Sequence, residues 1–193
     1  SNNEGLGHSV DRLQVSNSVP SIDAIGIRVG GNARVALDDI TLRNVQVGVD
    51  WSTQSDLEGA IDNLLMERTI DGHSTVGIRV GGNARVAMGG IELHQVHKGI
   101  DWTSAGDLYV RGLEVRGFTS GGVWASNAAS VVLNQVEISD LYQSPGIQAG
   151  HQPPQYDDGE TPIGIRVGGN AIPSIHLSDI NMIRVGGNAR SGE

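Results

Sequence analysis

One spacing of apolar residues recurs along most of this chain and constrains its fold: apolar-x-apolar-x-x-apolar-x-apolar. Val35, Leu37, Ile40 and Leu42 give a complete example. The instances begin at His8, Val35, Gly59, Val86, Leu108, Val131 and Ile175, so a histidine or a glycine fills the first slot in two of them. A period of two on both sides of a two-residue break predicts two short strands that meet at a corner, each with one face inward. An amphipathic helix would need spacings of three and four.

The two-residue breaks have a composition of their own. Their second member is usually Gly, Asn or Asp, the residues that best tolerate a left-handed backbone conformation. The pairs are Asp11-Arg12, Asp38-Asp39, Asp62-Asn63, Gly89-Gly90, Arg111-Gly112, Asn134-Gln135 and Ser178-Asp179. We therefore expect the chain to bend sharply at each pair.

A further short strand precedes each corner unit and begins with glycine followed by an aliphatic residue. These strands are expected at Gly26, Gly48, Gly77, Gly99, Gly122, Gly146 and Gly164. Three of them open the octapeptide Gly-Ile-Arg-Val-Gly-Gly-Asn-Ala, at 26–33, 77–84 and 164–171, and a fourth copy without its glycine occupies 183–189. The Gly-Gly-Asn-Ala part lacks a phosphate-loop signature and is followed by a strand, which indicates a tight turn.

Three short strands in each repeating unit resemble one coil of the right-handed parallel β-helix of pectate lyases, mannuronan epimerases and phage tailspikes. The resemblance covers about residues 9–182 and implies an all-β, right-handed parallel β-helix (solenoid) of about seven to eight coils, three strands per coil. We expect one domain, residues 1–193. Residues 1–7 and 183–193 are predicted caps or tails, and the proline-containing segment 150–162 a loop that leaves the stack.

Stacked coils place equivalent residues in columns, and two outward columns alternate in sign. The first is Arg28, Asp50, Arg79 and Asp101, and the second is Arg34, Glu58, Arg85 and Asp107. A slip by one coil would bring like charges together, so we interpret both columns as structural charge ladders that fix the stacking.

A third outward column contains three carboxylates, Glu92, Glu114 and Glu137, with Arg116 beside them. Carboxylates on successive coils repel one another unless a cation lies among them, and such oxygen-rich clusters can hold Ca²⁺. The lyases that the repeat resembles use acidic clusters with Ca²⁺ and a basic residue. This cluster is therefore the candidate site for a cation or an acidic sugar, and Ca²⁺ is its candidate cofactor; neutralisation of the glutamates by Arg116 is the alternative.

Two other features suggest contacts. Trp124 is a candidate platform for stacking a sugar, whereas Trp51 and Trp102 are expected to face inward. An outward column of small or apolar residues is a candidate interface, because a solvated strand face normally carries polar residues. It comprises Ala36, Ala60, Ala87, Tyr109 and Val132. We expect a terminal segment or another subunit to cover it, as in fibrous trimers of tailspike type.

Composition limits the classes of function. The net charge of −9 argues against non-specific nucleic-acid binding, the absence of cysteine excludes disulfides, and no apolar run is long enough to span a bilayer. We expect a non-enzymatic structural or adhesive module of an extracellular, cell or virion surface that contacts polysaccharide, with further copies of the chain or neighbouring structural subunits as partners. A polysaccharide lyase, epimerase or hydrolase and a carbohydrate-binding domain are the alternatives.

Overall fold

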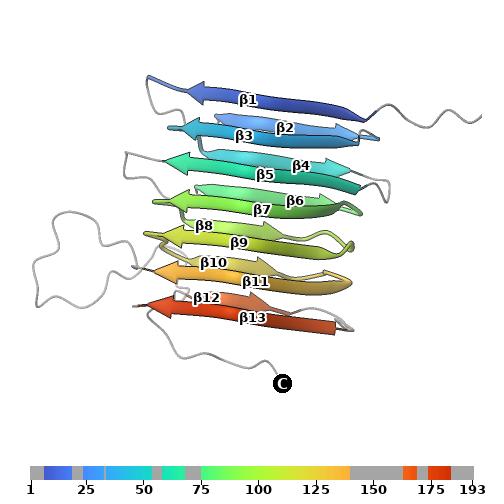
Figure 1. Cartoon of the computed structure of the whole chain (residues 1–193), viewed down its shortest axis with the longest axis vertical. Coiled ribbons are helices and arrows are strands. Elements are labelled where there is room, and N and C mark those ends of the chain that lie inside the picture. The colour runs from blue at the N-terminus through green and yellow to red at the C-terminus, as the bar shows by residue number, and fades with distance from the viewer. Residues whose placement is uncertain are drawn as a thin grey trace, which may run out of the picture.

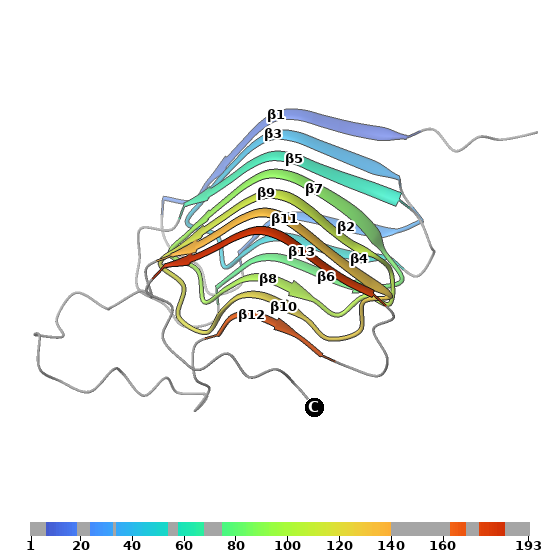
Figure 2. The ribbon, with the colours of Figure 1, turned by 60° about the horizontal axis from the view of Figure 1, so that its bottom comes forward.

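The computed structural model describes residues 7–18, 24–32, 34–53, 58–67, 75–139, 163–168 and 174–183, in which thirteen strands and no helix occur. They form two parallel sheets that face each other (Figure 2). Sheet A contains β1 (His8–Ser16), β3 (Val35–Arg43), β5 (Glu58–Glu67), β7 (Arg85–His94), β9 (Leu108–Arg116), β11 (Ser130–Ser139) and β13 (Ser174–Ile183). Sheet B contains β2 (Ile25–Gly31), β4 (Val47–Thr53), β6 (Val76–Gly82), β8 (Lys98–Trp102), β10 (Gly121–Ala125) and β12 (Ile163–Val167).

The chain alternates between the sheets, and each strand pairs in parallel with the strand two places later. Sheet A runs from right to left in front and sheet B returns behind it as the chain descends, which is a right-handed winding (Figure 1). The predicted right-handed parallel β-helix is therefore confirmed. Six strands of sheet B and seven of sheet A make six coils and one additional strand, slightly fewer than the seven to eight coils predicted.

The predicted corners lie inside the strands of sheet A. The second residue of every corner pair has a positive φ, from 51° at Asn63 to 72° at Gly112, so the chain bends there as expected. The backbone pairing continues on both sides of the bend, as in the partners Val10–Leu37 and Leu13–Ile40. The two strands predicted around each corner thus form one bent strand, and a coil has two strands rather than three.

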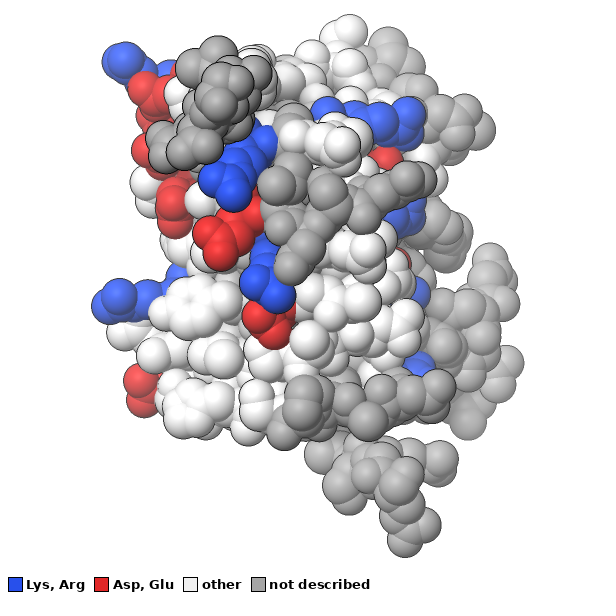
Figure 3. Space-filling view, turned by 90° about the vertical axis from the view of Figure 1, so that its right-hand side faces the viewer, with Lys and Arg blue, Asp and Glu red and all other residues white. Residues whose placement is uncertain are grey.

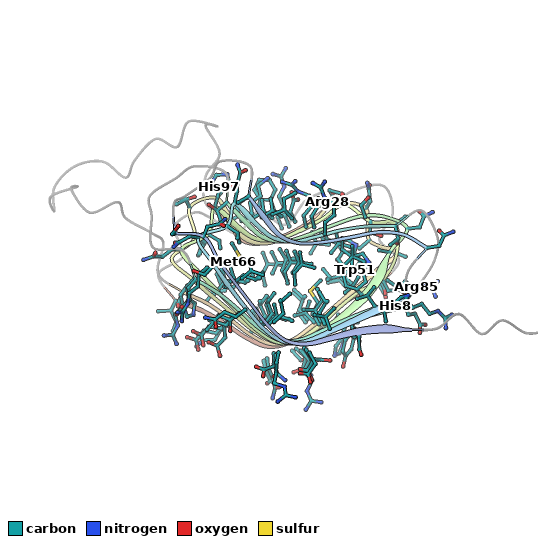
Figure 4. The ribbon with its side chains drawn as sticks, turned by 90° about the horizontal axis from the view of Figure 1, so that it is seen from above. His8, Arg28, Trp51, Met66, Arg85 and His97 are labelled. Atoms are coloured by element: carbon teal, nitrogen blue, oxygen red, sulfur yellow. The ribbon has the colours of Figure 1, made fainter. Side chains whose placement is uncertain are left out.

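The apolar columns of the repeat form the core between the two sheets. Trp51 and Met66 lie among stacked apolar side chains in the view along the axis (Figure 4). Trp51 and Trp102 are fully buried, as predicted. Gly59 fills the first apolar slot of β5 because a Cβ atom there would collide with the indole of Trp51.

The second residue of each sheet B strand is glycine for a related reason. A Cβ atom on Gly48 would lie 2.5 Å from the carbonyl oxygen of Gly77 and 2.7 Å from Sδ of Met66. Gly26, Gly77, Gly99 and Gly122 meet the same two obstacles, a carbonyl on the next coil and an apolar side chain of sheet A. Only glycine leaves room for the coils to stack here.

The coil predicted at Gly146 falls outside the described residues. β12 pairs directly with β10, and Arg166 lies beside Trp124 in the register, so no strand separates them. Residues 140–162, which include Gly146 and the predicted 150–162 loop, lie outside the described residues. Ile183, predicted to begin the C-terminal cap or tail, is the last residue of β13. Residues 1–6 and 184–193, and with them most of the predicted caps and of the fourth octapeptide copy, also lie outside the described part.

Candidate functional site

The register places Arg28, Asp50, Arg79 and Asp101 in one outward column of sheet B. Nε of Arg28 lies 3.3 Å from Oδ2 of Asp50, and Arg28 projects away from the core (Figure 4). The Arg28 side chain is 67% exposed, so this pair contributes little to stability beyond fixing the register.

A second alternating column runs along the side where sheet B passes to sheet A. Glu58 pairs with Arg85 in the register, and Nε of Arg85 lies 3.8 Å from Oδ2 of Asp107. Ser130 continues the column and donates a hydrogen bond to Oδ1 of Asp107 (2.7 Å), while Arg34 directly precedes β3 at its N-terminal end. Basic and acidic side chains alternate down this side of the rod (Figure 3).

Glu92, Glu114 and Glu137 are neighbours in one outward column of β7, β9 and β11. Nε of Arg116 forms an ion pair with Oε1 of Glu114, and its Nη2 lies 3.9 Å from Oε1 of Glu137. Nε2 of His94 lies 3.6 Å from the same Glu114 oxygen. Arg116 therefore neutralises the centre of the acidic column, as the alternative interpretation expects.

The acidic column does not present a set of side chains arranged as metal ligands. Within the described ranges, no group of three or more His, Asp or Glu side chains is placed to hold one. The three glutamates stand one coil apart, and the guanidinium of Arg116 already contacts two of them. The geometry adds no support for the Ca²⁺ that the sequence suggested here.

The column of small and apolar residues lies on the outer face of sheet A. Its members are register partners on successive strands: Ala36, Ala60, Ala87, Tyr109 and Val132. Tyr109 is 45% exposed, and Ala36 and Ala87 are also exposed. The stripe is continuous over five strands.

Trp124 lies in the outward column of sheet B, between Asp101 and Arg166. Its indole lies back along β10 over Gly121, where a Cβ atom would collide with the ring. Nζ of Lys98 is 3.8 Å from the ring centroid, and Cζ of Arg166 is 5.0 Å from it. Lys98 and Arg166 come from the strands on either side of β10, so the aromatic ring and two cations form one surface cluster.

A hollow of about 320 Å³ opens beside this cluster. It is lined by Asp101, Trp124, Ala125, Ser126, Arg166 and Gly168. The hollow combines an aromatic side chain, a hydroxyl group, a carboxylate and a guanidinium. These are the groups with which proteins bind the apolar faces and the polar substituents of a small ligand or a single sugar residue.

Of this cluster, the sequence identified Trp124 as a candidate site residue but missed Lys98. The evidence for Lys98 lies in the register. One column of sheet B reads, from coil to coil, Ile25, Val47, Val76, Lys98, Gly121 and Ile163, so Lys98 and Gly121 are its two members without an apolar side chain. In this column the lysine and, one coil later, the glycine lie where the indole of Trp124 rests on the sheet. That signal could be recognised only after the coils had been aligned.

Comparison with family models, with curated proteins and with solved structures found no match for this chain. Among the described residues no helix is long and apolar enough to cross a membrane.

Proposed function

We propose that this chain is a non-enzymatic structural and adhesive β-helix module that binds polysaccharide through the Trp124 cluster. The observation that carries the proposal is the outward Trp124, held between Lys98 and Arg166 at the edge of a hollow on a rigid sheet. Sugars stack their apolar faces on aromatic rings, and the two cations favour chains that carry carboxylates or sulfates.

We also propose a location and partners for the rod. A rod of this kind suits an extracellular, cell or virion surface, where a rigid scaffold presents a binding face. The stripe from Ala36 to Val132 is the proposed side-by-side contact with further copies, in a trimer or with neighbouring subunits. A relationship with the pectate-lyase-like and tailspike β-helices rests on the repeat pattern.

A lyase, epimerase or hydrolase remains the second candidate, and the contact between Glu114 and Arg116 is the feature that favours it. A carboxylate beside an arginine can serve proton transfer at a uronate. Absorbance of an unsaturated uronate product, measured with and without Ca²⁺, tests this candidate. Activity that is lost in Glu114→Gln would replace the binding proposal with an enzymatic one.

The binding proposal predicts that Trp124→Ala weakens retention of the chain by an immobilised polysaccharide. Affinity electrophoresis against polygalacturonate, alginate and uncharged dextran measures it. We expect acidic polymers to retard the wild-type chain and Trp124→Ala to weaken that binding by about tenfold, as for an aromatic residue at the centre of a binding contact. Lys98→Ala should weaken binding to the acidic polymers alone.

Arg79→Ala is the matched control, because Arg79 lies in the same outward column two coils away from Trp124. It should bind as the wild type does. Equal retention of the wild type and Trp124→Ala, with circular dichroism spectra that match, would remove Trp124 from the site. No retention by any polymer would end the proposal.

A further inference from the structure

The C-terminal end of the rod exposes its core. β13 pairs with β11 on one edge, and no other described strand pairs with it (Figure 1). Ile175, Leu177 and Met182 belong to inward columns, yet they are 52%, 48% and 51% exposed. Their partners on β11, Val131, Leu133 and Ile138, are fully buried. An unpaired edge with exposed apolar side chains is a template for a further strand.

The opposite end of the rod presents a strand of the same design. β1 pairs with β3 alone among the described strands, and its Val10, Leu13 and Val15 are partly buried against the core. Arg12 in β1 and Asp179 in β13 occupy the same corner position, with φ values of 57° and 52°. The two bent strands therefore have matching shapes, and three of their four inward columns would continue as apolar columns, while His8 would stand against Ile175 in the fourth.

The charges at the two corners are complementary. In the register of the other coils, β1 placed on β13 brings the guanidinium of Arg12 beside the carboxylate of Asp179. The second corner residues of adjacent coils do lie side by side within this chain, since a Cβ atom on Gly90 would lie 2.9 Å from Oδ1 of Asn63. Arg12 also pairs with Asp11 of its own strand, with Nε 3.5 Å from Oδ2, and Asp11 would stand opposite Ser178. The remaining outward pairs are Ser9 with His176, Gln14 with Asn181 and Ser16 with Ile183, so no like charges stand directly opposite each other.

The numbers of strands in the two sheets determine the spacing in sheet B at this contact. Sheet A has one strand more than sheet B, so β1 stacked on β13 of another copy leaves one strand position open in sheet B. Arg166 of β12 and Arg28 of the next copy's β2 would then be about two strand spacings, roughly 10 Å, apart. The stack thus avoids placing these two arginines side by side.

We propose that β13 of one copy pairs in parallel with β1 of a second copy, so that the rods assemble head to tail. This contact lies at the ends of the rod and is distinct from the stripe on its side. A head-to-tail contact does not close on itself, and it therefore forms open chains of rods. A tail-to-tail contact through two copies of β13 would instead bring two Asp179 carboxylates together.

Sedimentation velocity of the full chain, from about 1 μM to about 1 mM, tests the assembly. We expect species larger than dimers to grow with concentration. Asp179→Arg and Arg12→Asp should each weaken association by about five- to tenfold, and an equimolar mixture of the two variants should restore it. The substituted corners can hold an arginine or an aspartate, because Arg12 and Asp39 already occupy this corner position with a positive φ. Circular dichroism verifies that each variant folds.

Tyr109→Lys is the control for the side stripe and should leave end-to-end association unchanged. A loss of association in Tyr109→Lys, with no effect of Asp179→Arg, would assign the contact to the stripe and overturn the proposal. A monomer at all concentrations would overturn it as well. So would association that appears only after residues 184–193 are deleted, because the chain's own tail would then be the occupant of β13.

Discussion

The glycines at the second position of the sheet B strands show how a single residue type fixes the distance between coils. In β6, a Cβ atom on Gly77 would lie 2.6 Å from the carbonyl oxygen of Gly99 and 2.7 Å from Cδ1 of Leu93. Both atoms belong to the packed interior, so neither can move away without disturbing a neighbouring coil. The repeated glycine is thus a packing requirement of the stack.

We expect Gly77→Ala to lower the free energy of unfolding by about 1–3 kcal/mol, the usual cost of overpacking a core. Gly81→Ala is the control in the same strand, because its Cβ would meet Oγ1 of Thr103 at an ordinary 3.4 Å. It should change the stability by less than about 0.5 kcal/mol. Urea denaturation measures both, and equal stabilities of the two variants would contradict the close packing at Gly77.

The bent strands of sheet A are the elements that the sequence predicted best. The corner pairs and the inward apolar columns could be read from the chain because each depends on residues only a few positions apart. The continuity of each strand through its corner could not, because it depends on hydrogen bonds to other coils. Asp38 and Asp62 are partners at the first corner position, and the pairing resumes at Ile40 and Leu64 after the bend.

Gln135 tests the corner directly, since it has a φ of 56° without being glycine, asparagine or aspartate. Gln135→Val should be less stable than Gln135→Gly by about 1–2 kcal/mol, because a branched side chain is disfavoured in the left-handed region. The midpoints of urea denaturation compare the two variants. A valine variant as stable as the glycine variant would be inconsistent with the bend at this corner.

At the scale of the whole molecule, local sequence patterns were not sufficient to predict which coils are adjacent. Gly146-Ile147 has the local pattern of a sheet B strand, but no corner unit follows it, and β12 stacks directly on β10. The same pairing brings Arg166 beside Trp124, and pairing with β8 brings Lys98 there. The sequence could therefore offer Trp124 as a candidate platform for a sugar, whereas its cationic neighbours depend on which coils are adjacent.

The most direct test of this account asks whether β13 stacks on β11 without an intervening coil, because the Trp124 cluster depends on that order. The chain contains no cysteine, so a pair can be introduced at the outward partners Glu137 and Asn181. Adjacent parallel strands are about 4.8 Å apart, within the Cα separation that a disulfide spans, whereas two coils are separated by roughly 10 Å. Mild oxidation followed by mass analysis after thiol alkylation should show an intramolecular disulfide in Glu137→Cys/Asn181→Cys and free thiols in Glu114→Cys/Asn181→Cys. Free thiols in the first pair, or equal cross-linking of both, would contradict the account.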